Sequence, residues 1–165
     1  MPKTGFSGLH AQDLSARPLS VQYSPTRLTL QLPTLDVMSE IVKVPYTGGE
    51  YPVEWLGRSI GMLEGSSLPG EGITVLTGHN HLNTTEAGPF ALLSCLDAGD
   101  LVMITDSEGA MQNWHVYKSV KIPADGFSRI AGDVKENALV LMTCEDESPD
   151  GGYLNRRVVL AEQLH

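Results

Sequence analysis

The sequence predicts a mainly β fold, a closed or nearly closed antiparallel barrel of seven or eight strands with two or three short helices. Short apolar runs with strand-like spacing recur along the chain, and turn residues separate them, including 17 Gly and 10 Pro in total. Helical spacing is sparse and does not alternate regularly with the strands, which favours a barrel over a doubly wound parallel sheet. A chain of 165 residues fits one such domain.

The strand candidates follow one another from the first third of the chain to its end. The segment RLTLQLP, residues 27–33, alternates apolar and polar residues with period two, as a half-buried strand does. Further candidates are residues 41–45, 72–78, 100–105, 114–122, 138–144 and 156–164. Helical patterns are limited to residues 53–63 and 89–96, with a single turn at 125–130.

The start of the chain is polar and has no periodic pattern. Pro2 has a fixed φ and pushes the preceding residue towards extended geometry, so a helix is not expected there. We therefore expect residues 1–25 to form an extended arm and residues 26–165 to form the folded domain.

Charge and hydropathy exclude two classes of function. The formal net charge is −9, and the 11 Lys and Arg form no basic run, so the electrostatic footprint of a nucleic-acid-binding protein is missing. The chain contains no run of 18 apolar residues, as a membrane-spanning helix requires.

Three chemically useful side chains lie where predicted strands meet loops. His79 follows ITVLTG, Cys144 follows LVLMT, and Arg156 opens RVVLAE. A cysteine thiolate is a strong nucleophile, a histidine can exchange protons with it, and an arginine can hold a developing oxyanion. The acidic residues after Cys144 suggest an exposed strand edge, whereas Cys95, in the apolar run FALLSCL, is expected to be buried.

The same residues also have noncatalytic explanations, which the sequence leaves open. A cysteine after an apolar strand is commonly a core residue, and a histidine in Gly-His-Asn is commonly a turn residue. The pair His79 and His81 hints at a metal but lacks a third ligand at suitable spacing, and no cofactor is expected. The acidic stretch 145–150 is typical of a solvated loop, with a calcium contact as the alternative.

Taken together, four motifs resemble the sortase family. TGHN, then GPFALLSCLDAGDLVMI, then LVLMTC and finally NRRVVLAE occur in the order and spacing of that family, over about residues 27–164. The family pattern T-L-x-T-C is met at Leu141, Thr143 and Cys144, but Val140 replaces its first threonine. The resemblance implies a sortase-like barrel and a cysteine transpeptidase that needs no cofactor.

The resemblance also implies roles for individual residues. Cys144 would be the nucleophile, His79 the proton donor and acceptor, and Arg156 the oxyanion ligand. The backbone N–H of Glu145 would assist at the oxyanion, and Thr143 would line the substrate site. Arg157 competes with Arg156, but neighbouring strand residues face opposite ways, so only one of the two can reach the thiol.

The substrates and location follow from the same resemblance. Sortases recognise a surface protein that bears an L-P-x-T-G sorting signal, cut it between Thr and Gly, and join it to an amine of the cell wall or to a pilin lysine. The enzyme would act on the extracellular face of a bacterial membrane, anchored by a segment absent from this sequence. The sortase class and the acceptor amine stay open. A cysteine hydrolase that releases free acid and a noncatalytic surface-binding β-domain are the alternative functions.

The first five residues match the family's own signal class in all but one position. Met1, Pro2, Lys3, Thr4 and Gly5 differ from L-P-x-T-G only in the first residue, and methionine can fill a pocket that takes leucine. The hypothesis is that the arm acts as a pseudosubstrate, in its own molecule or by exchange with a neighbour. The alternative is a coincidence within a polar arm.

Overall fold

The computed structural model describes residues 21–83, 85–147, 149 and 152–164. The proposed pseudosubstrate residues Met1–Gly5 therefore lie outside the described residues. Among the described residues, no helix is long and apolar enough to cross a membrane.

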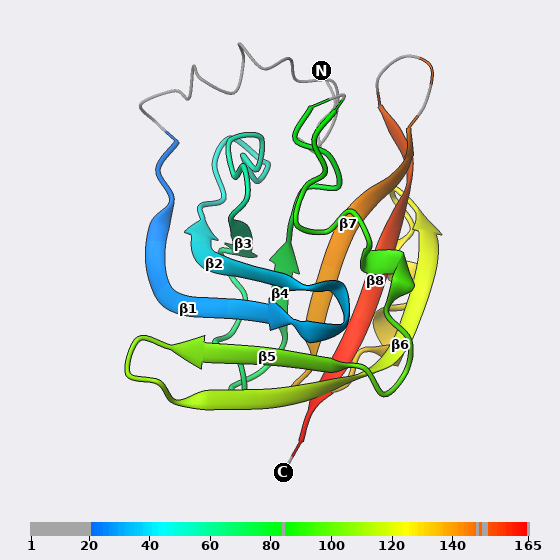
Figure 1. The fold of residues 1–165 in the computed structure, drawn as a ribbon. Helices are drawn as coiled ribbons and strands as arrows, with labels where there is room; N and C mark the ends of the chain where they lie inside the picture. Colours follow the sequence, from blue (N-terminus) through cyan, green and yellow to red (C-terminus); the bar gives the residue numbers. More distant parts are fainter. Residues whose placement is uncertain (1–20, 84, 148, 150–151, 165) are drawn as a thin grey trace.

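Eight strands form a closed barrel in the spatial order β1-β2-β3-β4-β7-β8-β6-β5 (Figure 1), which confirms the predicted fold class. The helical elements among the described residues are four short 3-10 turns. The strands are β1 Ser24–Leu32, β2 Val37–Val44, β3 Ile60–Leu63, β4 Thr74–Thr77, β5 Leu101–Asp106, β6 Met111–Pro123, β7 Leu139–Glu147 and β8 Tyr153–Gln163. The turns are η1 Pro33–Leu35, η2 Leu93–Cys95, η3 Phe127–Arg129 and η4 Ala131–Asp133.

The barrel is not wholly antiparallel, which corrects one sequence-based expectation. Strands β2 and β3 pair in parallel, as do β4 and β7. These parallel pairs depend on long connections that return the chain to the same end of the barrel, and period-two patterning within a strand carries no information on the direction of its neighbour.

The expected helix over residues 53–63 is also wrong. Gly57 has a positive φ of 58°, which a regular helix does not accommodate, and strand β3 follows it. Strand β3 then joins β2 and β4. The expected helix over 89–96 is reduced to η2, whereas the turn expected over 125–130 appears as η3.

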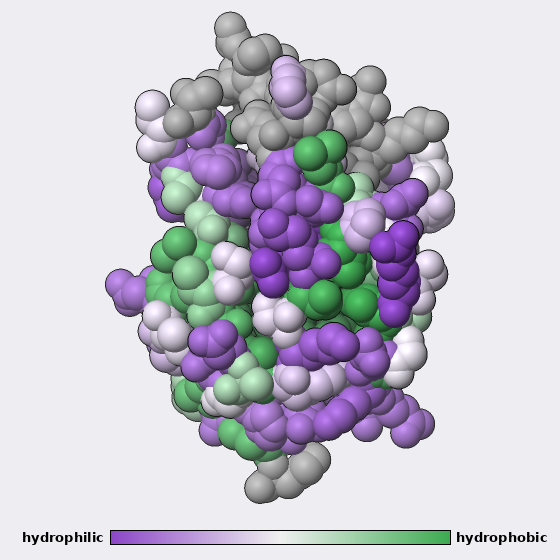
Figure 2. All heavy atoms as spheres, turned by 90° about the vertical axis from the view of Figure 1, so that its right-hand side faces the viewer, coloured by the Kyte–Doolittle hydropathy of each residue, from purple (hydrophilic) through white to green (hydrophobic). Residues whose placement is uncertain are grey.

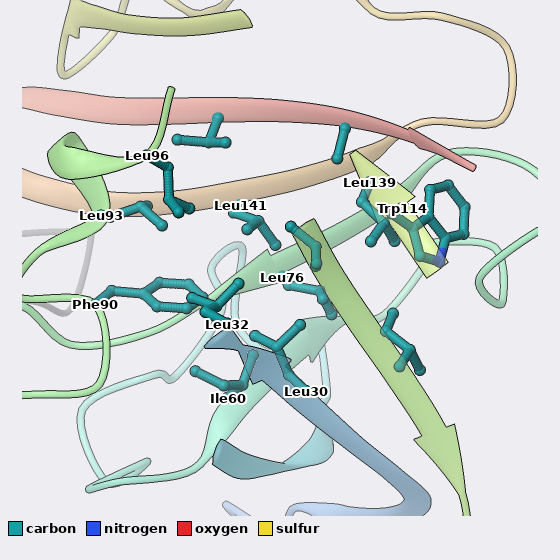
Figure 3. Packing of buried hydrophobic residues seen from close by; sticks show 14 of the residues in the cluster. Leu30, Leu32, Ile60, Leu76, Phe90, Leu93, Leu96, Trp114, Leu139 and Leu141 are labelled. Carbon is teal, nitrogen blue, oxygen red and sulfur yellow. The ribbon is translucent and has the colours of Figure 1, made fainter. Parts of the chain in front are cut away.

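The barrel interior holds the main core (Figure 3). Its largest fully buried side chains are Trp114 and Phe90. Alternate residues of β7 and β8 point outwards, where Val140, Val158 and Leu160 pack with Ile122 and Ile130 in a second cluster. Figure 2 shows apolar side chains set among polar ones on the side of the molecule that carries β6 and β8. Both faces of the central strands are therefore packed, which gives the strand ends a rigid support.

Candidate active site

Strand register brings the three predicted catalytic residues to one end of the barrel. Thr77, the last residue of β4, lies opposite Met142 of the parallel strand β7. His79 and Cys144 each follow two residues later, so they lie level with one another. On the other side of β7, Cys144 lies directly opposite Arg156 of β8. Cys144 on β7, Arg156 on β8 and His79 just after β4 thus come to the same end of three adjacent strands, and all three side chains are buried.

The loop that carries His79 is fastened to β7 by three hydrogen bonds. The N–H of Gly78 donates to the carbonyl of Met142 over 3.3 Å, and the hydroxyl of Thr143 donates to the carbonyl of Gly78 over 2.8 Å. The side-chain amide of Asn80 donates to the carbonyl of Cys144 itself over 2.8 Å. These bonds hold the histidine loop in register with the nucleophile.

Of the residues in these hydrogen bonds, Thr143 was predicted from the sequence as a site residue and Asn80 was not. Thr143 was predicted to contact substrate, and that role stays a prediction, since its buried hydroxyl is engaged with Gly78. Asn80 was missed by sequence reasoning. Its position next to His79 was the one available signal, because its partner lies 64 residues away.

The two adjacent arginines face opposite ways, as strand alternation requires. The Nη1 of Arg156 donates to the Sγ of Cys144. The Nε of Arg157 instead donates to Oε2 of Glu145 over 2.8 Å. The geometry therefore favours Arg156 over Arg157 as the partner of the thiol.

Burial keeps both reactive groups neutral. It raises the pKa of the Cys144 thiol to about 11, although the charge and hydrogen bond of Arg156 act in the opposite direction. Burial also lowers the pKa of His79 to about 4, against backbone hydrogen bonds at Val53 and Glu54 that raise it. At neutral pH both shifts favour the thiol and the neutral imidazole over the thiolate–imidazolium pair.

The sequence-based expectation for the two cysteines, with Cys95 buried and Cys144 at an exposed edge, is wrong. Cys144 is only 1% exposed, whereas Cys95 is exposed, and neither forms a disulfide. Cys95 ends η2, whose inward side is formed by Leu93, with Leu96 following. Cys144 is covered by side chains over its own face of the sheet, and that of Arg156 reaches its sulfur.

Thiol labelling should separate these two cysteines. We expect an alkylating reagent to modify Cys95 readily at pH 7 and Cys144 slowly, because about one Cys144 thiol in 10,000 is ionised at that pH if its pKa is about 11. The rate at Cys144 should rise about tenfold per pH unit between pH 7 and pH 9. Peptide mapping by mass spectrometry, with Cys95→Ser as the background control, gives each rate. Equal rates at the two cysteines at pH 7 would contradict the buried, neutral thiol.

Backbone alternation bears on the predicted role of Glu145. The carbonyls of Met142 and Cys144 both point towards the β4 side of β7, where they accept hydrogen bonds. The N–H of Glu145 is therefore directed towards β8, where Asn155 lies opposite. Its contact with an oxyanion stays a prediction, and Arg156 is the donor that already reaches the sulfur.

The possible metal ligands do not gather. His79 is buried while His81 is exposed. Within the described ranges, no three His, Cys, Asp or Glu side chains lie close enough together to hold an ion. The chemically active groups that the structure brings to this site are the thiol, the imidazole and the guanidinium.

Comparison with known proteins gives one consistent result. The family model described as the sortase domain matches residues 30–164. No match was found among curated protein sequences.

Three solved structures illustrate the fold. Sortase C-1 from Actinomyces oris is 21% identical with a TM-score of 0.66, over 86% of this chain and 75% of that one. Sortase C-3 from Streptococcus pneumoniae is 18% identical with a TM-score of 0.68, over 96% and 70% of the respective chains. A lid mutant of sortase A from Corynebacterium diphtheriae is 24% identical with a TM-score of 0.67, over 90% and 74%.

These structural likenesses show the barrel fold, and the family model shows the membership. It spans nearly all of the described domain, including the ends of β4, β7 and β8 where the buried trio lies. The chain belongs to the sortase family, whose members are cysteine transpeptidases of the bacterial cell surface.

Proposed function

We propose that this chain cleaves an L-P-x-T-G-type sorting signal between Thr and Gly and transfers the threonyl group to an amine. The single observation that carries the proposal is the buried contact between the Arg156 guanidinium and the Cys144 sulfur, level with His79. A nucleophile, a proton carrier and an oxyanion donor are the three groups that acyl transfer through a thioester requires.

In the acylation step, the Sγ of Cys144 attacks the threonine carbonyl carbon, and its proton passes to His79. The guanidinium of Arg156 holds the resulting oxyanion. The C–N bond then breaks, and His79 returns the proton to the departing glycine amine, leaving a thioester on Cys144. In the second step an amine attacks the thioester, its proton passes through His79, and the thiol is restored.

The shifted pKa values of Cys144 and His79 suggest that bound substrate also affects their ionisation. Since burial is the largest cause of both pKa displacements, the charged pair is favoured only where hydrogen bonds or dipoles replace the water that burial removes. We therefore expect catalysis to depend strongly on the polar contacts that a bound signal peptide makes at the site.

The substrate assignment is supported by the family and by one relative. Members of the family act on sorting signals at the bacterial cell surface, and the sortase C of Clostridium perfringens has been solved with a C-terminal cell wall sorting motif. For this chain, a surface protein with such a signal is the proposed donor. A cell-wall peptide amine or a pilin lysine is the proposed acceptor.

The test is a fluorogenic L-P-x-T-G peptide series, with and without added glycine or lysine amines. The proposal expects cleavage that depends on Cys144 and an amide product when amine is present. Release of free acid alone, unaffected by amine, would favour a cysteine hydrolase. A noncatalytic surface-binding domain would be favoured if no peptide of the series is cleaved and if Cys144→Ala binds surfaces as the parent protein does.

We propose further that the MPKTG arm acts as a pseudosubstrate. Its support is the sequence match alone, since four of the five residues fit the signal pattern in the required order and Met1 replaces its leucine. Removing residues 1–8 should raise the rate of peptide cleavage and of thiol labelling at Cys144, because the groove is then open to solvent and substrate. A dependence of the full-length rate on protein concentration would indicate exchange of arms between molecules. Equal rates with and without the arm, at all protein concentrations, would remove the idea.

A further inference from the structure

A tyrosine hydroxyl just before β1 closes the turn that lies against His79. The Oη of Tyr23 donates to the carbonyl of Pro52 over 2.5 Å and accepts the N–H of Trp55 over 3.3 Å. The two partners stand at the two ends of residues 52–55. One hydroxyl therefore joins the beginning and the end of this short segment, which we name the Tyr23 clasp.

The segment inside the clasp reaches the imidazole through its backbone. Val53 and Glu54, the two residues between the clasped positions, make the backbone hydrogen bonds that act on His79. The segment is also well covered, because Val53 and Leu56 are buried and pack with Val44 in a small apolar cluster that Tyr23 and Tyr51 border. The clasp thus holds the segment whose backbone hydrogen-bonds to the imidazole and whose apolar side chains help to exclude water from it.

We infer that Tyr23 is a positioning residue for His79 and acts through the clasped segment 52–55. This inference rests on the proposed function for its kinetic consequences, but the position of the imidazole can be measured without any substrate. No sequence signal marks the relation, because Tyr23 lies 29 and 32 residues from its two partners.

Removing the hydroxyl should loosen the segment without unfolding the domain. The tyrosine ring keeps its apolar packing in Tyr23→Phe, whereas the carbonyl of Pro52 and the N–H of Trp55 lose this partner. With the segment loosened, water reaches His79 and the imidazole samples more orientations. Loosening also weakens the backbone hydrogen bonds from Val53 and Glu54, which raise the pKa of His79, but burial is the larger cause. Better hydration therefore moves that pKa upwards from about 4 towards 6.5.

Several charged or titratable groups lie around the imidazole and have to be kept in view. Glu54 lies on the clasped segment itself, Cys144 lies on β7 and Arg156 on β8. Burial raises the pKa of Glu54, so loosening the segment also favours its ionisation, which acts on His79 in the same upward direction. The thiol and the guanidinium are held by their strands and are unchanged by the substitution.

Tyr51→Phe is the matched control. The Tyr51 hydroxyl also donates to a backbone carbonyl, that of Glu64, over 2.7 Å, and its ring borders the same apolar cluster. It does not bind the ends of residues 52–55 in the way that Tyr23 does. The two substitutions thus remove the same chemical group from the same cluster and differ in the clasp.

The experiment compares Tyr23→Phe with Tyr51→Phe in the full chain, by NMR titration of the His79 ring and by steady-state kinetics on an L-P-x-T-G peptide. For Tyr23→Phe we expect an upward movement of the His79 midpoint and a fall in kcat of about tenfold, with KM within about twofold. Tyr51→Phe should leave both the midpoint and kcat near those of the parent protein.

An unchanged His79 midpoint in a folded Tyr23→Phe protein would overturn the inference, as would equal effects of the two substitutions. If no peptide is cleaved by the parent protein, the proposed function fails, but the NMR titration still decides whether Tyr23 positions His79. Thermal melting of all three proteins confirms that folded molecules are being compared.

Discussion

Replacing Arg156 with lysine is expected to lower kcat/KM for cleavage of an L-P-x-T-G peptide by about 100-fold. Lysine keeps the positive charge but loses the planar guanidinium, which can hold both the sulfur and a neighbouring oxyanion. Loss of one oxyanion donor costs about 100-fold to 1,000-fold in other acyl-transfer enzymes. Steady-state cleavage of the fluorogenic peptide measures the effect.

The adjacent Arg157 provides the control for this substitution. It pairs with Glu145 on the other face of the strand, away from the Cys144 sulfur, and a lysine there can keep the ion pair. Arg157→Lys should therefore retain activity to within about threefold. A larger loss with Arg157→Lys than with Arg156→Lys would reverse the assignment of the oxyanion ligand.

A readout without substrate supports the same comparison. The charge and the hydrogen bond of Arg156 lower the pKa of Cys144 against the effect of burial. Arg156→Ala should therefore raise that pKa further and slow alkylation of Cys144 at a given pH. Faster alkylation in this variant would show that the arginine mainly shields the thiol.

The substitution Gly88→Ala is expected to disturb the site through the backbone of His79. A Cβ added at Gly88 would lie 2.2 Å from the carbonyl oxygen of His79 and 2.6 Å from its carbonyl carbon. Two hydrogen bonds hold the backbone around Gly88 against the histidine loop. The N–H of Gly88 donates to the carbonyl of Asn80 over 2.7 Å, and the N–H of Phe90 donates to the carbonyl of His79 over 3.0 Å. The histidine loop must then shift away from residue 88.

The expected cost of this shift is about 1–3 kcal/mol in the free energy of unfolding, which lowers Tm by about 3–10 °C. Peptide cleavage should fall by about tenfold or more among the molecules that remain folded, because His79 then no longer stays level with Cys144. Gly132→Ala is the control, since nothing lies within 4 Å of the added Cβ there. Equal melting temperatures and equal activities for the two variants would contradict the close packing at His79.

The parts of the structure that were predictable depend on local patterns. The period-two run that became β1 and the apolar runs that became β4 and β7 carry their strand signal within a few residues. His79 and Cys144 were identified because each follows such a run at its end, and the family resemblance then assigned their roles. Alternation along β8 predicts that only one of Arg156 and Arg157 reaches the thiol, and the family resemblance favours Arg156.

The parts that were not predictable depend on contacts between distant segments. Residues 53–63 have apolar spacing that suits a helix, yet Ile60–Leu63 is a strand because β2 and β4 provide partners on both sides. The expected exposure of Cys95 and Cys144 was inverted because exposure depends on what packs over each side chain, which distant segments decide. The contacts of Asn80 with Cys144 and of Tyr23 with residues 52–55 join segments that no local pattern connects.

The central claim is that Cys144 carries the acyl group between signal peptide and amine. The most direct measurement is intact-mass analysis and peptide mapping after incubation with an L-P-x-T-G peptide, with Cys144→Ala in parallel. We predict a thioester adduct of the peptide's L-P-x-T part on Cys144, its disappearance when amine is added, and no adduct in Cys144→Ala. An adduct at Cys95, or peptide cleavage that persists in Cys144→Ala, would contradict the claim.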